Sequence, residues 1–186
     1  MYAAISADIV SSTSLSIDET VSLKKRIENL FLVLQDMYPG FWGRLIKGDY
    51  LECILPSAKD AFRVALLIKT CIKSFPLTDS KEKKMFQIYG VRIAVGIGDM
   101  RMVDKLQGIM DGEAIYMSGR ALEGMQAPNK RGTFIIDSSN QEQRPALQTV
   151  GMLVDALMNN ATRKQCEVLF YKLHSKGEQE IADILR

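Results

Sequence analysis

Two aspartates, Asp8 and Asp49, are the residues of this chain whose types and surroundings best suit metal chemistry. Asp8 ends an apolar run and precedes a hydroxyl-rich stretch, Ser11-Ser12-Thr13. Gly48-Asp49 interrupts two further apolar stretches, as the turn of a β-hairpin does. If the two strands are neighbours, the carboxylates converge, and paired carboxylates beside hydroxyls can hold Mg²⁺ that carries a polyphosphate. The alternative is that both aspartates serve only to form turns.

Apolar periodicity predicts the elements that must position this pair. The predicted strands are residues 2–10, 41–47, 50–55, 87–98 and 133–137, and the predicted helices begin at Ser16, Ser57 and Gly112. Residues 79–84 and 99–111 are predicted as loops. The fold class is therefore α/β of the α+β kind, with a split βαβ core. We expect a ferredoxin-like antiparallel sheet with helices on one face.

Bulk properties predict one domain with an appendage. The chain has 186 residues, 47% apolar and 25% charged, with a net charge of +2. We place a main domain at residues 1–150 and a helical tail at residues 151–186. No apolar stretch approaches the length that spans a bilayer, so no membrane partner is expected. The chain also starts without a signal-peptide pattern.

The cysteines and the histidine exclude several kinds of site. Cys53, Cys71 and Cys166 lack metal-ligand spacing, and their odd number suits a reducing compartment, so we expect a cytoplasmic protein. His174 is the only histidine, which excludes His-rich zinc sites and makes a His-dependent triad improbable. We interpret His174 as a structural residue at a helix end.

The order of four segments resembles the class III nucleotidyl cyclases over roughly residues 1 to 137. Residues 8–16 resemble their first metal-binding motif, and Gly48-Asp49 resembles their second metal aspartate. Residues 91–98 look like their central strand, and residues 112–121 like their last catalytic helix. The resemblance implies an Mg²⁺ site at Asp8, Ile9 and Asp49.

The same resemblance implies a set of residues that bind phosphate or nucleotide. These are Ser11, Ser12, Thr13, Lys47 and Arg120, the last matching the arginine that stabilises the phosphate transition state. The alternatives are a solvated Lys47 and an Arg120 paired with Glu113 or Glu123. In cyclases the metal aspartates and this arginine come from different subunits, which implies a possible homodimer.

Two positions depart from the cyclase pattern. Leu45 stands where the family has the lysine that selects adenine, and Tyr116 stands where an asparagine orients the ribose. Tyr116 could equally be a packing residue. The loss of the residues that select the base and orient the ribose favours a non-catalytic or weakly catalytic regulator that binds a nucleotide or another phosphorylated small molecule. The alternatives are an active metal-dependent cyclase or phosphohydrolase, and a protein-interaction module.

The tail carries a different pattern. Thr162-x-x-Gln165 is a capping box, and helices are predicted over residues 162–175 and 178–185. Together with Glu180-Ile181-Ala182 these residues resemble the first two helices of a sigma-region-4-like helix-turn-helix. The alternative is an ordinary helical hairpin packed on the main domain.

The resemblance of the tail to a helix-turn-helix leads to two expectations, one about DNA binding and one about the family that the chain resembles. The stretch from Gly151 to Arg186 has five basic and five acidic residues and lacks a recognition helix, so we expect DNA binding only in a longer form. A degenerate cyclase-like domain followed by such a tail resembles the SatD family of small bacterial proteins. That resemblance implies a transcriptional regulator.

Overall fold

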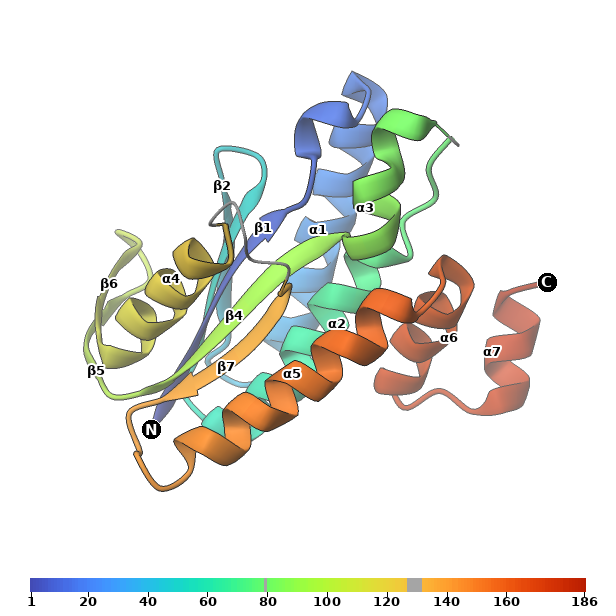
Figure 1. The fold of residues 1–186 in the computed structure, drawn as a ribbon. Helices are drawn as coiled ribbons and strands as arrows, with labels where there is room; N and C mark the ends of the chain where they lie inside the picture. Colours follow the sequence, from blue (N-terminus) through green and yellow to red (C-terminus); the bar gives the residue numbers. More distant parts are fainter. Residues whose placement is uncertain (79, 127–131) are drawn as a thin grey trace.

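A five-stranded sheet forms the centre of the protein in a computed structural model, which describes residues 1–78, 80–126 and 132–186 (Figure 1). Its strand order is β2-β3-β1-β4-β7. The strands are β1 (Tyr2–Ile9), β2 (Trp42–Ile46), β3 (Tyr50–Leu55), β4 (Val91–Gly98) and β7 (Phe134–Ser138). A separate two-stranded hairpin consists of β5 (Met100–Asp104) and β6 (Ile109–Gly112).

The strand order confirms the ferredoxin-like core. β1 lies between β3 and β4 and pairs with both in the antiparallel sense, and β2 pairs with β3. β7 departs from the antiparallel prediction, because it pairs with β4 in the parallel sense, with Ile93 opposite Phe134. The reason is that β4 and β7 are joined through a helix, a connection that returns the chain in the same direction.

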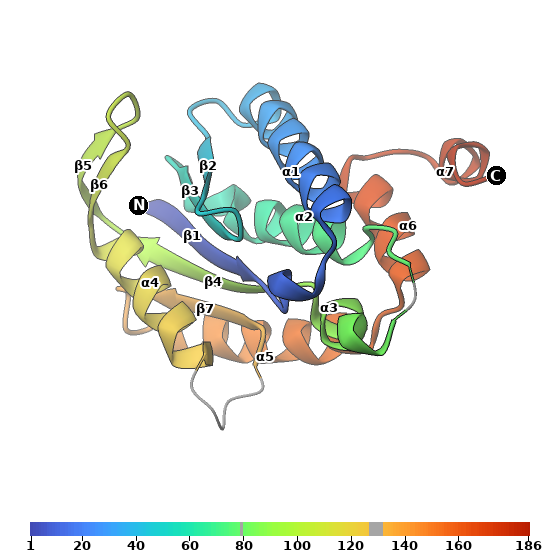
Figure 2. The same ribbon diagram turned by 90° about the horizontal axis from the view of Figure 1, so that it is seen from above.

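Helices cover both faces of the sheet, so the prediction of helices on one face is wrong. The helices are α1 (Ile17–Met37), α2 (Ala61–Lys73), α3 (Lys84–Tyr89), α4 (Glu113–Gln126), α5 (Arg144–Asn160), α6 (Arg163–Leu173) and α7 (Glu178–Ile184). α1 and α2 lie on one side and α4 on the other (Figure 2). Small residues on the second face, Ala4, Ala94 and Gly96, allow α4 to approach the strands closely.

Local sequence signals set the helix boundaries as predicted. In the capping box of α1, the Ser16 hydroxyl accepts from the Glu19 amide and the Glu19 carboxylate accepts from the Ser16 amide. Thr162 and Gln165 form the same reciprocal pair at α6. The residues expected to face inward from α2 are buried: Ala61, Val64, Ala65, Ile68, Cys71 and Ile72.

Three segments differ from the prediction. Residues 87–89, predicted as the start of a strand, belong to α3, because Gly90 ends the helix with a left-handed φ of 65° and β4 begins only at Val91. The predicted loop 99–111 contains the β5–β6 hairpin. Helix α5 was not predicted, and it runs without a break through residue 150, where we had placed the domain boundary.

The tail is packed on the main domain through α6. Cys166 is fully buried in the same core cluster as α2, and Arg63 of α2 donates from Nε to the Leu173 carbonyl over 2.9 Å. His174 is the C-terminal cap of α6, with Nδ1 2.8 Å from the Phe170 carbonyl, which confirms its structural role. α7 lies farther out, away from the sheet (Figure 1).

A buried lysine connects α2 with the sheet and with α5. The side chain of Lys69 has no exposed surface, and its ammonium donates to the Tyr89 carbonyl (2.9 Å), the Val91 carbonyl (2.6 Å) and the Thr133 hydroxyl (3.0 Å). That hydroxyl in turn donates to Asp155 Oδ1 over 2.6 Å. Burial lowers the pKa of Lys69 to about 7, while the Asp155 carboxylate acts in the opposite direction. All three ammonium hydrogens therefore have acceptors.

The substitution Thr133→Val tests this network. It removes one acceptor of a buried ammonium and one donor to Asp155 without changing the volume, so we expect a loss of about 1–3 kcal/mol in the free energy of unfolding. Urea unfolding followed by circular dichroism measures the loss. The control is Thr149→Val on α5, where an exposed hydroxyl donates only to the Pro145 carbonyl. Equal stabilities of the two variants would contradict the role given to Thr133.

The substitution Gly96→Ala tests the close approach of α4. An added Cβ would lie 2.2 Å from the Ala114 carbonyl oxygen and 2.7 Å from the Ser118 amide nitrogen, both backbone atoms that cannot move aside. We expect a loss of about 3 kcal/mol, at the upper end for overpacking. Gly119→Ala in α4 is the control, since no atom lies within 4 Å of its added Cβ. It should leave stability unchanged or raise it by up to about 1 kcal/mol. A stable Gly96→Ala protein would refute the packing argument.

Candidate functional site

Asp8 lies near the end of β1, on the face of the sheet that α4 covers. The strand register places it opposite Tyr50 of β3 and opposite Arg92 of β4. Asp8 is 9% exposed, so its carboxylate has little contact with water. A carboxylate in such a place needs a cation or several donors close by.

Arg92 provides that cation. Its Nε lies 3.0 Å from Asp8 Oδ1 and its Nη2 lies 2.6 Å from Asp8 Oδ2, a bidentate pair that engages both carboxylate oxygens. Sequence analysis missed Arg92, although a signal was present, because it is the only charged residue in strand 91–98. A divalent metal that binds Asp8 would compete with this guanidinium for the carboxylate oxygens.

Asp49 lies beside Ile9 at the same end of the sheet. The Ile9 amide donates to the Asp49 carbonyl over 2.9 Å, and the Ser12 hydroxyl donates to Asp49 Oδ2 over 2.9 Å. The two motifs that the sequence placed 41 positions apart therefore meet through the backbone. Ile9 itself is buried, with 5% of its surface exposed.

These residues do not fit a divalent metal as they are arranged. Both oxygens of Asp8 are bound to Arg92, and one oxygen of Asp49 is bound to Ser12. Across residues 1–78, 80–126 and 132–186 there is no group of three or more His, Cys, Asp or Glu side chains that could hold a metal ion. Mg²⁺ in proteins is bound by one or two carboxylates and completes its octahedron with waters and substrate phosphates, so what opposes metal binding here is that the carboxylate oxygens are already engaged by Arg92 and Ser12.

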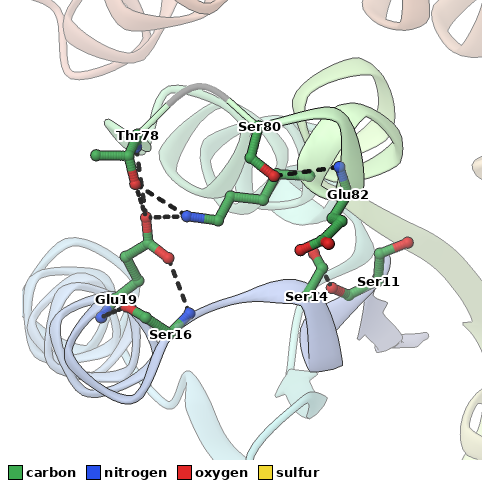
Figure 3. Close-up of polar contacts among 8 residues, drawn as sticks. Ser11, Ser14, Ser16, Glu19, Thr78, Ser80 and Glu82 are labelled. Carbon is green, nitrogen blue, oxygen red and sulfur yellow. Dashed lines mark hydrogen bonds and ion pairs between the residues drawn. The ribbon is translucent and has the colours of Figure 1, made fainter.

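The predicted hydroxyl-rich stretch forms a tight turn between β1 and α1. Ser11 has a left-handed φ of 52°, and residues Ser12–Ser14 form one turn of 3₁₀ helix. The Ser14 hydroxyl donates to the Ser11 carbonyl over 2.7 Å (Figure 3). Thr13 is exposed, whereas Ser11 and Ser12 are half-buried. The turn thus presents hydroxyls beside Asp49.

An ion pair fixes a neighbouring loop to the start of α1 (Figure 3). The Lys83 ammonium lies 2.7 Å from Glu19 Oε1, which also accepts from the Thr78 hydroxyl over 2.9 Å. These donors, Lys83 foremost, hold the pKa of Glu19 at about 2, well below its usual value of 4.5. Glu19 therefore serves both as the capping-box carboxylate and as the anchor of this loop.

Two lysines flank the turn between β2 and β3. Lys47 is exposed with a left-handed φ of 51°, and Gly48 follows with a φ of 92°. A Cβ added to Gly48 would lie 2.8 Å from Lys24 Nζ, so the ammonium of Lys24 on α1 lies against this turn. Sequence analysis missed Lys24, and no local pattern distinguishes it from the other lysines of α1.

The two predicted residues of α4 lie apart from the Asp8–Arg92 pair. Arg120 is exposed and forms no ion pair with any described residue, so the alternative pairing with Glu113 or Glu123 is not found. Tyr116 is 53% exposed, and its hydroxyl donates to Asp111. This hydrogen bond raises the pKa of Tyr116 and lowers that of Asp111. Tyr116 is therefore not a packing residue.

Comparisons with known proteins give structural likeness only. No protein-family model matches the sequence, and no curated protein does. A solved structure of a bacterial light-regulated adenylyl cyclase matches with a TM-score of 0.49 and 16% identity over 74% of each chain. A second structure with that description has a TM-score of 0.49 and 15% identity, over 74% of this chain and 42% of its own. The crystal structure of the guanylyl cyclase Cya2 has a TM-score of 0.44 and 11% identity, over 72% of this chain and 80% of its own.

These likenesses have limited weight because every TM-score is below 0.5. The fold class rests on the strand order and the pairing senses described above. Among the described residues no helix is long and apolar enough to cross a membrane. All three cysteines are buried and free of disulfides.

The Glu19 anchor predicts a specific dependence of stability on pH. Folding lowers the pKa of Glu19 to about 2. The contribution of Glu19 to the free energy of unfolding is therefore complete above pH 4.5 and is lost as the pH falls toward 2. The difference in unfolding free energy between the native protein and Glu19→Gln should therefore shrink across that range. Urea unfolding at several pH values measures it.

The control for this prediction is Glu28→Gln. Glu28 is an exposed residue of the same helix and forms no ion pair with the described residues. Its substitution removes the same charge without removing an anchor. A difference for Glu19→Gln that stays constant from pH 6 to pH 2 would show that the Lys83 pair does not stabilise the fold.

Proposed function

We propose that this chain is a regulatory domain with a cyclase-like fold that binds a phosphorylated ligand without metal-dependent turnover. The observation that carries the proposal is the bidentate ion pair between Asp8 and Arg92. The planar guanidinium matches both carboxylate oxygens at once, a geometry that holds the pair together. The carboxylate that would hold the metal therefore has a permanent internal partner.

The ligand class follows from the groups near this end of the sheet. Hydroxyls of Ser11, Ser12 and Thr13 lie in the turn after β1, Lys47 lies in the turn between β2 and β3, and the ammonium of Lys24 on α1 lies against that second turn. Hydroxyl donors and cations are the groups that bind phosphate oxygens. We infer a nucleotide or another phosphorylated small molecule as ligand, with Mg²⁺ entering only if it arrives bound to the phosphates.

A homodimer would complete this site with Arg120. Its guanidinium is exposed and has no carboxylate partner among the described residues, which supports a role toward a second chain. A two-fold arrangement would then bring Arg120 of one copy to the phosphates bound by the other. This part of the proposal follows the resemblance to cyclases.

The tail supports a regulatory role more than direct DNA binding. Each of its basic residues lies within 4 Å of a carboxylate: Arg163, Lys164, Lys172, Lys176 and Arg186. Paired cations leave little charge for neutralising DNA phosphates. We propose that the full-length protein, of the kind seen in the SatD family, acts as a cytoplasmic transcriptional regulator and contacts DNA through a segment other than α6 and α7.

The decisive experiment compares the native protein with Arg92→Gln. In calorimetric titration, Mn²⁺ should bind Arg92→Gln at least about tenfold more tightly than it binds the native protein. A tenfold change in Kd corresponds to about 1.4 kcal/mol, the least that we expect from removing the guanidinium that competes for Asp8. Titration of the native protein with ATP and GTP, with and without Mg²⁺, should show binding without cyclisation or hydrolysis. The control variant is Arg101→Gln, which breaks a different arginine–aspartate pair, with Asp111.

Three results would overturn the proposal. Mn²⁺ binding by the native protein as tight as that by Arg92→Gln would show that the guanidinium does not protect Asp8. Turnover of ATP or GTP that disappears in Asp8→Asn would establish the rival reading, an active metal-dependent enzyme. Failure of every nucleotide to bind would leave a protein-interaction module.

A further inference from the structure

A second buried lysine of α2 lacks the partners that Lys69 has. Lys73 is 2% exposed, and among the described residues its ammonium has one acceptor, the Met158 carbonyl. An ammonium carries three hydrogens, so two of them remain without an acceptor there. No described carboxylate lies within ion-pair distance of Lys73.

Among the described residues, the ammonium of Lys73 lacks a counter-ion as well as two of its hydrogen-bond acceptors. Lys69 lies one helical turn earlier, and the two like charges repel each other. Burial lowers the pKa of Lys73, which is the direction expected for a desolvated cation without a counter-ion. An unpaired buried charge is costly, and a protein keeps one where an external partner can compensate it.

A small cavity of about 200 Å³ lies next to Lys73. It is lined by Lys73 at the end of α2, Phe75 and Leu77 after it, Phe86 and Gln87 of α3, and Arg163 of α6. The apolar side chains in this lining strengthen any electrostatic contact inside, because they lower the local dielectric constant. Arg163 is the first residue of α6, so the positive end of that helix dipole lies at the same place.

Arg163 adds a second cation to the lining of the cavity. Its guanidinium lies 3.6 Å from Glu167 Oε2, and this carboxylate is shared with Lys164 at 3.2 Å. The arginine side chain is 42% exposed, so it can turn toward the cavity. A planar guanidinium and an ammonium together match the oxygens of a tetrahedral anion.

We propose that the cavity between α2, α3 and α6 binds a small oxyanion, a phosphate ion or the phosphate group of a small monoester. Lys73 supplies two donors from within the core, and Arg163 supplies a fork of donors at the mouth. The volume lies below the 300–1,000 Å³ typical of drug-sized ligands, so a nucleoside triphosphate does not fit.

This site is separate from the one under "Proposed function". It lies among α2, α3 and α6, whereas Asp8 and Arg92 lie on the face of the sheet that α4 covers. Its ligand bridges the main domain and the first helix of the tail. Binding there would therefore stabilise the attachment of α6 to α2 and α3.

Calorimetric titration of the full chain with inorganic phosphate tests the proposal. One phosphate should bind per chain, with about tenfold weaker binding in Arg163→Gln, a loss of about 1.4 kcal/mol. Binding should be lost in Lys73→Met, a variant of similar volume whose folding is checked by circular dichroism. Lys172→Gln, which removes the same charge from an exposed position of α6, should bind phosphate like the native protein.

Thermal unfolding gives a second measurement. Phosphate should raise the melting temperature of the native protein and of Lys172→Gln, but not that of Lys73→Met. Glycerol 3-phosphate identifies the source of the anion: binding tighter than phosphate indicates a monoester, and failure to displace phosphate indicates the free ion. An absence of saturable binding by both compounds, or binding unchanged in Arg163→Gln and Lys73→Met, would overturn the proposal and leave the Asp8 site unaffected.

Discussion

The antiparallel pairing of β1 on both of its edges is the constraint on which the rest of this structure depends. Seven of its eight residues are buried, and most have small side chains, so helices can pack on both faces of the sheet. The same register fixes what surrounds Asp8. The neighbours of Asp8 on the adjacent strands are Tyr50 and Arg92, so the cation beside its carboxylate is that of Arg92. A shift of one residue would turn Asp8 into the opposite, apolar layer.

Buried charge is handled in two different ways in the interior. Asp8 has a guanidinium, and Lys69 has three acceptors together with the nearby Asp155 carboxylate, so each charge is compensated within the fold. Lys73 has one acceptor among the described residues and lies beside a cavity. Because buried charges are tolerated only when they are paired, this contrast distinguishes a structural lysine from one that is available to a ligand.

Local patterns predicted the strands of the main sheet, helices α1, α2, α4, α6 and α7 and both capping boxes, because apolar spacing and capping side chains act within a few residues. They failed where a contact joins distant segments. Arg92 pairs with Asp8 across 84 positions, and no rule of spacing connects them. Lys69 and Lys73 of α2 are buried by contacts that no local pattern indicates: Lys69 donates to carbonyls at the start of β4, and Lys73 donates to the Met158 carbonyl of α5. The parallel addition of β7 likewise depends on how α4 crosses the sheet.

An arginine in place of a metal changes what the Asp8 site can do. Divalent ions neutralise phosphate charge, and they also lower the pKa of a bound hydroxyl and thereby generate a nucleophile. The guanidinium of Arg92 shares only the first property, since it is a fixed donor that neither coordinates nor activates a hydroxyl. Both oxygens of Asp8 accept hydrogen bonds from Arg92, so the guanidinium already neutralises the charge of this carboxylate. Under the proposed function, the site would therefore recognise phosphate through its charged groups without transferring it.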